Sequence, residues 1–327
     1  MINRRHLVVA AAATAARLPT ARAAGAVRRV GVLSPYQAVA SRASPWLAVF
    51  LAELQHAGYD IGRNLLADSL YAEGEVARLP ALAGELVRRE PELIVALGND
   101  AIAAARAATQ TVPIVMAFSA EPVGTGLVAS LARPGANVTG TTWLSAEIAA
   151  KALELLRAAL PSLTRLGAIG NPDTPGMRFY RDAFSSAAAQ MGVESFPFPV
   201  HSPDEVGAML ESIAGSRVQA LYVTAEPATE ARVADVAAFA LRHKLPTMGV
   251  GPRLVEAGGL LYYGADVHET IARIVSFIDR ILRGARPADL PIEQPSRFEF
   301  VANQRTARAL GITLPANLLL RATRVIE

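Results

Sequence analysis

The sequence predicts an α/β protein of two doubly wound parallel-sheet lobes. Its 327 residues exceed the ~150 residues of one typical domain, so two hydrophobic cores are expected. Short, continuous apolar runs alternate with segments of helical spacing, which is typical of buried parallel strands covered by helices on both faces. This alternation occurs twice, once on each side of the glycine- and proline-rich stretch 118–142. The repetition predicts two related lobes.

The first series of elements precedes residue 118. Leu47, Leu51 and Leu54 recur at helical spacing and mark one buried face. The run 92–97 (ELIVAL) is continuously apolar and stops at Gly98, as expected of a strand covered on both faces. The strands expected here are 28–34, 64–71, 92–97 and 112–118, and the helices are 45–57, 75–89 and 101–108.

The second series restarts after residue 142 and ends in a different kind of tail. Pro287, Pro291 and Pro295 are spaced by four in a stretch that cannot be regular helix. Ordered apolar structure follows this stretch, so we expect it to connect the two lobes. The strands expected are 165–170, 194–200, 218–224, 247–250, 260–263 and 298–301, and the helices are 146–160, 176–191, 203–213, 231–243, 267–282 and 306–310.

Composition excludes several classes of function. The net charge is +3, but four arginines lie in the first 24 residues, where there is no acidic residue, so the remainder is close to neutral. A neutral chain has no electrostatic footprint for nucleic acid or an anionic membrane. There is no cysteine, which excludes disulfides, thiolate nucleophiles, cysteine metal sites and a lipid-modified N-terminal cysteine.

Residues 1–24 have the pattern of an export signal. Arg4 and Arg5 precede a short apolar run, and Ala21-Arg22-Ala23 fits a small-x-small cleavage site. The run is shorter than the ~20 residues of a membrane span. The arginine pair is similar to a twin-arginine signal. Arginine pairs also occur in signals of the general secretory route, so both export routes are compatible with this segment. Export without a lipid anchor predicts the periplasm; the alternative is a disordered N-terminal tail.

Motifs for catalysis, metals and cofactors are weak in this chain. Its five histidines share no i, i+3 or i+4 spacing, so we expect no metal site and no catalytic cluster. Gly124-x-Gly126-x-x-Ala129 matches a dinucleotide motif, but Pro122 separates it from the preceding strand. The next acidic residue, Glu147, opens a helix rather than ending a strand, so no cofactor is predicted.

Polar loops recur where the predicted strands end. Parallel strands place their carboxyl ends at one edge of a sheet, where ligands bind in open α/β folds. Two lobes that each offer such an edge can close on a small polar molecule. The alternative for any single residue is a helix cap or turn. The loops are Ser34-Pro35-Tyr36, Gly98-Asn99-Asp100, Ser119-Ala120-Glu121, Asn171-Pro172-Asp173, Thr224-Ala225-Glu226 and Gly251-Pro252.

Four aromatic residues lie in or beside these loops. Stacking on an aromatic wall contributes ~0.5–1.5 kcal/mol for a planar ligand. We favour core packing for Trp46 and Tyr222, and both roles stay open for Tyr36 and Trp143.

Several long motifs, in the same order, resemble a family of ABC-transporter solute-binding proteins that includes the tryptophan/tyrosine-binding TrpX type. The most specific is 128–140 (VASLARPGANVTG), and the resemblance covers nearly the whole chain after the export signal. The other matching segments are 79–87 (LPALAGELV), 121–124 (EPVG), 257–260 (AGGL), 288–295 (ADLPIEQP) and 306–311 (TARALG).

The resemblance implies a type I periplasmic-binding-protein fold, with two lobes joined by a three-strand hinge and the ligand between them. The lobes are expected at 26–140 with 264–294, and at 141–263 with 295–327. A monomer that passes a small organic solute to an inner-membrane permease and ATPase is implied, and catalysis is not. The ligand contacts that the resemblance implies are Ser34, Gly98, Asn99, Ser119 and Glu121 from the first lobe, and Thr141, Thr142, Asn171, Thr224 and Glu226 from the second. Tyr36 is added to this set because it lies in one of the polar loops.

Two departures and several alternatives qualify this expectation. Many relatives place Asp-Pro where this chain has Glu121-Pro122, and an Asp-containing turn at Ala225-Glu226, so the solute is not fixed by the resemblance. It is an amino acid, an aromatic acid or another small carboxylate. The same fold also serves exported sensory modules, and a cleft carboxylate is a candidate general base. Cytosolic repression of transcription is disfavoured by the signal.

Three parts of the stretch 118–142 are expected to have different roles. Ser119 and Glu121 are expected to touch the solute, and 124–135 shapes the last turn of the lobe. We expect 138–142 to be the first crossing between the lobes, with Gly140 allowing the bend. On this hypothesis Gly140→Val impairs closure with little loss of fold.

Overall fold

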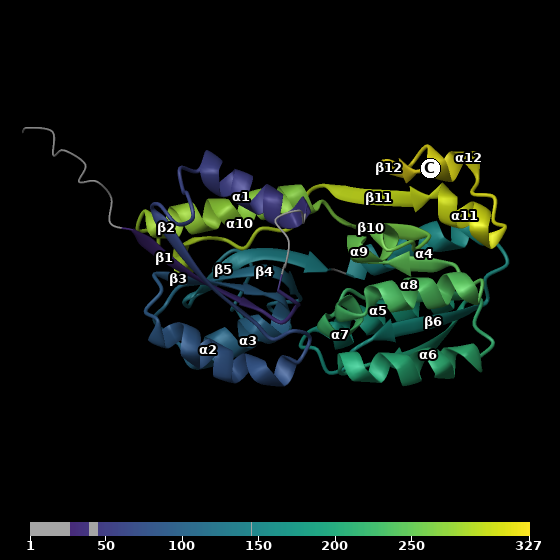
Figure 1. The fold of residues 1–327 in the computed structure, drawn as a ribbon, viewed down its shortest axis with the longest axis horizontal. Helices are drawn as coiled ribbons and strands as arrows, with labels where there is room; N and C mark the ends of the chain where they lie inside the picture. The colour runs from purple at the N-terminus through teal and green to yellow at the C-terminus, as the bar shows by residue number, and fades with distance from the viewer. Residues whose placement is uncertain (1–26, 39–44, 145) are drawn as a thin grey trace, which may run out of the picture.

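A computed structural model of the protein describes residues 27–38, 45–144 and 146–327. The export signal predicted at residues 1–24 lies outside these residues. Figure 1 shows two lobes side by side along the long axis of the molecule. The first lobe combines the early strands with one late helix, and the C-terminus lies in the second lobe (Figure 1). None of the helices formed by the described residues is long and apolar enough to cross a membrane.

The first lobe is built on a five-stranded parallel sheet in the order β2-β1-β3-β4-β5. The helices α2 (Leu79–Arg88) and α3 (Gly98–Ala108) cover one face, and α1 (Pro45–His56) and α10 (Val267–Leu282) cover the other (Figure 1). Burial on both faces explains why β3 is apolar throughout. The strands are β1 (Arg28–Ser34), β2 (Leu65–Tyr71), β3 (Leu93–Leu97), β4 (Ile114–Ala120) and β5 (Val138–Leu144).

The second lobe is built on a seven-stranded sheet in the order β12-β11-β10-β9-β8-β6-β7. The helices α4 (Ala146–Ala159) and α5 (Met177–Gln190) cover one face, and α6 (Val206–Ala214) and α8 (Val233–Arg242) cover the other. The strands are β6 (Arg165–Gly170), β7 (Glu194–Pro199), β8 (Ala220–Val223), β9 (Thr247–Gly249), β10 (Leu261–Ala265), β11 (Phe298–Asn303) and β12 (Arg324–Ile326).

This sheet is parallel except between β10 and β11, which are antiparallel. The chain leaves along β10 toward the first lobe and returns along β11, so the two strands run in opposite directions. The sequence did not indicate the short elements α7 (Pro227–Ala231), α9 (Pro252–Glu256), η3 (Pro287–Asp289) and α12 (Ala316–Leu319). The helix expected at 306–310 is α11 and begins earlier, at Gln304 (Gln304–Leu310). The helices expected from 75 and 203 begin with 3₁₀ turns, η1 (Val76–Arg78) and η2 (Pro203–Glu205).

Three crossings join the lobes and lie side by side. The chain crosses after β5, between β10 and α10, and between Glu293 and β11. The Glu293 N–H donates to Gly140 O at 3.0 Å, and its carbonyl accepts from Thr142 N at 3.0 Å. Asp266 N donates to Arg297 O at 2.9 Å, which ties the second crossing to the third. The crossings therefore form a three-strand hinge.

A charged network holds the third crossing against α10. Arg273 forms ion pairs of 2.8 Å with both Glu269 and Glu293. The Glu269 carboxylate also accepts from the backbone N–H groups of Ser296 and Arg297, at 3.2 and 2.9 Å. Burial acts to raise the pKa of Glu269, but hydrogen bonds from Ser296, Arg273 and Arg297 outweigh it and lower the pKa to about 2. The carboxylate is therefore ionised at neutral pH and fixes this side of the hinge.

The role expected for 138–142 is wrong, because these residues are paired within the first sheet. In β5, Val138 pairs with Ile114 of β4 and Leu144 pairs with Ala120, with register shifts between these pairs. The boundary predicted between residues 140 and 141 falls inside this strand. Gly140 has φ +135°, and a Cβ there would lie 2.2 Å from Met116 O. Gly140 therefore serves close strand pairing rather than a bend between lobes.

Gly140→Val is accordingly expected to destabilise the first lobe, contrary to the expectation from the sequence. The strained φ alone costs about 1–3 kcal/mol, and displacement of the β4 backbone adds to this. Urea unfolding of the variant measures the loss. The matched control is Gly84→Ala in α2, where a Cβ would meet only Arg88 Nη1 at 3.6 Å. That control is expected to stabilise by about 0.5–1 kcal/mol. An unchanged unfolding midpoint for Gly140→Val would contradict the pairing of β5 on β4.

Candidate functional site

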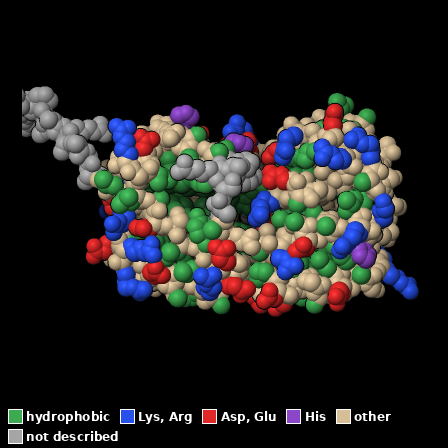
Figure 2. Space-filling model, in the orientation of Figure 1, with side chains coloured by type: hydrophobic (Ala, Val, Ile, Leu, Met, Phe, Trp, Pro, Cys, Tyr) green, Lys and Arg blue, Asp and Glu red, His purple; other side chains and the backbone are tan. Residues whose placement is uncertain are grey.

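The carboxyl ends of strands from both sheets face each other between the lobes, and the predicted polar residues lie there. This region is called the interlobe interface. Figure 2 shows the surface hollowed where the lobes meet, with charged side chains on both sides. Buried polar groups need hydrogen-bond partners, so the partners of each decide its role. The predicted residues that are buried are Ser34, Asn99, Ser119, Thr141, Thr142, Asn171, Thr224 and Glu226.

Asn99 connects the lobes through its side-chain amide. Asn99 Oδ1 accepts from Ser119 Oγ at 3.0 Å and from Ala120 N at 2.9 Å. Asn99 Nδ2 donates to Ala120 O at 2.7 Å and to Pro175 O of the second lobe. These four bonds use the full capacity of a carboxamide. The expected loop at 98–100 is in fact the first turn of α3, which follows β3 directly.

Tyr36 makes a second connection. Its hydroxyl donates to Ala225 O across the interface at 3.3 Å, and its backbone N–H donates to Ser34 Oγ at 3.2 Å. Gly98 has φ +74°, and a Cβ there would lie 3.5 Å from the Tyr36 hydroxyl. Burial raises the pKa of Tyr36 above its ordinary range, and the charges of Glu230, Asp100 and Glu226 raise it further. Ser34 therefore orients Tyr36, whose hydroxyl lies among carboxyl groups of both lobes.

Glu226 is the most unusual polar residue of the second lobe. It is 4% exposed, and its Oε2 accepts from Asn171 N. Its Oε1 is buried and has no hydrogen-bond partner among the described residues. Burial raises the pKa of Glu226 to about 8; hydrogen bonds from Asn171 and Thr224 oppose this rise, and the charge of Asp100 adds to it. Gly170 allows this packing, because a Cβ there would lie 2.4 Å from Thr224 Oγ1.

Two further carboxyl groups belong to this site but were not among the predicted contacts. Burial raises the pKa of Asp100 to about 6. Burial also raises the pKa of Glu230 to about 7, although Arg253 lies 3.3 Å away and acts to lower it. Asp100 lies in one of the polar loops that the sequence identified, so its place directly after a predicted strand could have marked it as a site residue. Glu230 lies inside α7, a helix that the sequence did not indicate.

The remaining predicted residues have more local roles. Glu121 is only partly buried, has φ +47° and accepts from Thr125 N at 3.0 Å through its carbonyl, so it shapes the turn after β4. Thr141 and Thr142 lie in β5, beside Glu293 at the hinge. Thr141 Oγ1 is buried and has no hydrogen-bond partner among the described residues. Asn171 Oδ1 accepts from Asp173 N at 3.0 Å, which is a local turn contact.

The four aromatic residues singled out in the sequence lie in different parts of the structure. Trp143 is buried at the hinge, where it packs edge-to-face on Phe118 with ring centroids 5.1 Å apart. Tyr222 packs on Phe184 in the second core, with centroids 4.4 Å apart, which confirms the favoured assignment. The side chain of Trp46 lies outside the described part of the chain. Of the three members whose side chains the structure describes, Tyr36 reaches the interlobe interface.

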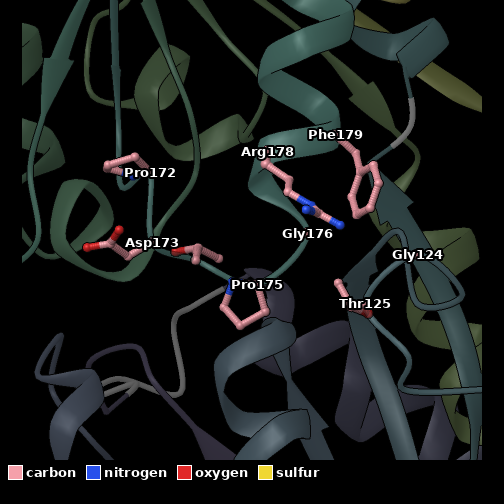
Figure 3. Close-up of a pocket in the computed structure, with 9 residues that line it drawn as sticks. Gly124, Thr125, Pro172, Asp173, Pro175, Gly176, Arg178 and Phe179 are labelled. Atoms are coloured by element: carbon pink, nitrogen blue, oxygen red, sulfur yellow. The ribbon is translucent and has the colours of Figure 1, made fainter.

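A shallow hollow of about 340 Å³ lies at the edge of the interface, between the turn at Gly124 and Thr125 and the loop 172–179 (Figure 3). Phe179 of the second lobe faces the first-lobe turn, and a Cβ at Gly124 would lie 2.9 Å from its ring. Gly176 has φ +86°, and a Cβ there would lie 2.7 Å from Ala120 O. The lobes can therefore meet here only because both residues are glycine.

The arrangement is suited to holding a small polar molecule. Within the described residues, no group of three or more His, Asp or Glu side chains could hold a metal ion. Backbone groups and side-chain amides of both lobes lie at the interlobe interface. The Glu226 carboxyl group lies there too and has one oxygen without a hydrogen-bond partner among the described residues. A carboxyl group with a raised pKa can also serve as a general base.

The buried carboxyl of Glu226 predicts a pH-dependent stability. In the unfolded chain this group titrates near 4.5, whereas in the folded protein its pKa is about 8. The folded state therefore holds a proton that the unfolded state releases, so stability falls as pH rises between these values, by at most about 1.4 kcal/mol per pH unit. Glu226→Gln is expected to flatten this slope in urea unfolding between pH 4.5 and 8.5. Equal slopes in Glu226→Gln and the exposed control Glu211→Gln would contradict the assignment.

Gly176 offers a separate test of lobe closure. Gly176→Ala is expected to hold the lobes apart, because the added Cβ would collide with the backbone of Ala120. The matched control is Gly192→Ala, which has φ +69° but no atom within 4 Å of the added Cβ. Small-angle scattering is expected to show a larger radius of gyration for Gly176→Ala only. If both variants scatter like the wild type, the contact of Gly176 with Ala120 does not limit closure.

Comparisons with known proteins agree with this architecture. A family model described as ABC transporter substrate binding protein matches residues 48–326. The tyrosine-binding protein of Clostridioides difficile is 27% identical over 264 residues, which are 80% of this chain and 75% of that protein.

Two solved structures are similar over 91% of this chain and 99% of their own, each at 26% identity. One is a conserved domain protein from Vibrio cholerae, with a TM-score of 0.84, and the other is an ABC domain from Streptococcus pneumonia in complex with L-Trp, with a TM-score of 0.82. They confirm the type I periplasmic-binding-protein fold that the sequence motifs implied. Since the family model extends from α1 to β12, the chain belongs to the family of ABC transporter substrate-binding proteins.

Proposed function

We propose that the protein is the receptor of an ABC importer and captures a zwitterionic amino acid between its lobes. The observation that carries this proposal is Glu226, a carboxyl group buried at the interlobe interface with one oxygen unpartnered among the described residues. An unpaired buried carboxylate is costly, and a ligand ammonium supplies both the missing N–H donors and the opposite charge. Asp100 of the first lobe adds a second negative group.

Aromatic amino acids are the first candidates. One relative is named as a tyrosine-binding protein, and a similar structure was solved with L-Trp. In this chain Tyr36 supplies an aromatic ring at the interface, and a planar side chain stacked on it would gain ~0.5–1.5 kcal/mol. The proposed lining of the site is Ser34, Tyr36, Gly98, Asn99, Ser119 and Glu121 of the first lobe, and Thr141, Thr142, Asn171, Thr224 and Glu226 at the hinge and in the second lobe. Asn99 contributes by its position, because its amide is already fully bonded within the protein.

Closure of the lobes provides the signal for transport. A ligand shifts an equilibrium between open and closed forms only if it binds the closed form more tightly, and contacts from both lobes supply that difference. The closed receptor would deliver the amino acid to a permease and an ATPase in the inner membrane. Export of a monomer to the periplasm, directed by residues 1–24, completes this proposal. The relatives are binding proteins, which favours capture over catalysis by Glu226.

Calorimetry and thermal-shift measurements on the exported chain test the proposal. L-Tyr, L-Trp and L-Phe are compared with aliphatic amino acids and with 3-arylpropanoates, which lack the amine. A ligand at 100 times its Kd stabilises the native state by about 2.7 kcal/mol. Glu226→Gln is expected to weaken amino-acid binding at least about tenfold, because a charge-assisted hydrogen bond contributes ~1.5–3 kcal/mol. Glu211→Gln, which changes an exposed carboxylate, serves as the control. Saturable binding of no amino acid, or equal binding of the arylpropanoates, would refute the proposed ligand class.

A further inference from the structure

The second crossing of the hinge contains no free length of chain. β10 ends at Ala265, and the next residue, Asp266, already caps α10, because its carboxylate accepts from Glu269 N at 3.0 Å. α10 packs on the sheet of the first lobe, whereas β10 belongs to the sheet of the second lobe. The chain therefore passes from one lobe to the other within a single peptide unit at this point.

The third crossing, between Glu293 and Phe298, is longer than the second. The backbone is bonded to the first sheet at Glu293, whose carbonyl accepts from Thr142 N at 3.0 Å. The β10–β11 ladder of the second sheet begins at Phe298, which pairs with Ala265. Between these points lie residues 294–297, and Pro295 among them has no backbone N–H to donate. A segment of this length adds rotatable backbone bonds to the hinge unless other contacts hold it.

Side chains of α10 hold this segment against the first lobe. The Glu269 carboxylate, in a side chain that is 11% exposed, accepts from Ser296 N at 3.2 Å and from Arg297 N at 2.9 Å. Arg273 lies one turn further along α10, where its Nη2 donates to Ser296 Oγ at 3.0 Å and its Nη1 pairs with the Glu293 carboxylate at 2.8 Å. Arg273 and Glu269 also pair with each other at 2.8 Å. Hydrogen bonds to ionised groups are stronger than neutral ones, so both ends of the segment are anchored to α10.

We propose that Glu269 and Arg273 form a clamp that places the pivot of the hinge at 265–266 and 297–298, so that the lobes rotate at these positions and not along 294–297. Hinges are commonly a few residues at the ends of elements, which absorb the change in φ and ψ. Without the clamp, residues 294–297 would add conformational freedom, and more open arrangements would compete with the closed one. Glu269 and Arg273 act by way of the third crossing, so they are positioning residues. Lobe closure itself is part of the proposed function, whereas the position of the pivot is independent of the ligand.

The clamp can be tested on the empty protein. Glu269→Gln is expected to raise amide hydrogen exchange at Ser296 and Arg297 at least about tenfold, because both N–H groups lose a charged acceptor. The chain has no cysteine, so Ala81→Cys on α2 and Ser212→Cys on α6, both at exposed positions, give one spin label on each lobe. Pulsed dipolar spectroscopy is expected to show a broader distribution of interlobe distances in Glu269→Gln than in the labelled wild type.

Arg273→Gln and Arg283→Gln form a matched pair. Each removes an i,i+4 ion pair of α10, since Arg273 pairs with Glu269 at 2.8 Å and Arg283 pairs with Asp279 at 2.7 Å. Arg283 lies at the opposite end of α10 from the crossings. Arg273→Gln is expected to broaden the distance distribution, and Arg283→Gln is expected to leave both the distribution and the exchange at residues 296 and 297 as in wild type. Equal broadening in both variants would overturn the clamp, because it would reflect the stability of the helix.

Two further results would also overturn the clamp. One is unchanged exchange at residues 296 and 297 in Glu269→Gln, and the other is faster exchange with an unchanged distance distribution, which would place the pivot elsewhere. A last arm adds L-Tyr or L-Trp, which are expected to narrow the distribution in wild type and to bind Glu269→Gln more weakly. If neither amino acid binds wild type while the clamp variants broaden in the empty protein, the pivot stands and the proposed ligand class fails.

Discussion

The side-chain amide of Asn99 ties the edge of the first lobe to the second lobe. It joins the ends of β3 and β4 within the first lobe and reaches Pro175 of the second lobe with the same nitrogen. A buried amide needs partners for all its donors and acceptors, and here one amide serves both the local turn and the interlobe contact. The shape of the first lobe's edge is therefore coupled to the position of the second lobe, which is the coupling that a two-lobed receptor needs.

Glycines set how closely the lobes approach. Gly176 lies on Ala120 O, and Gly124 lies under the ring of Phe179, so a side chain at either place would separate the surfaces. The backbone near β4 is also unusual, since Phe118 and Glu121 both have positive φ. Such strain persists only where the surrounding structure holds it, and it is common at ligand sites. Close packing and local strain thus occur together at the edge of the sheet that faces the second lobe.

Much of the fold followed from the sequence because its signals are local. Continuous apolar runs such as 92–97 predicted buried strands, and polar residues at their ends located the interface. The role of Gly140 could not be predicted, because a glycine-rich strand and a linker look alike until the partner, Met116, is known. Glu230 was missed for a similar reason, since its burial depends on the packing of α7 and not on neighbours in the chain.

Two functions of a buried carboxyl group can be separated by what surrounds it. Glu269, at the hinge, is surrounded by Arg273 and backbone N–H groups, and its pKa is low, so it stabilises the folded protein at neutral pH. Glu226 is buried with too few donors, and its pKa is high, so it costs stability as it ionises. Selection for stability alone would pair or remove such a group. Its presence at the interlobe interface is understandable if a ligand cation completes the pairing, so that the free energy lost on burying the carboxylate is recovered on binding.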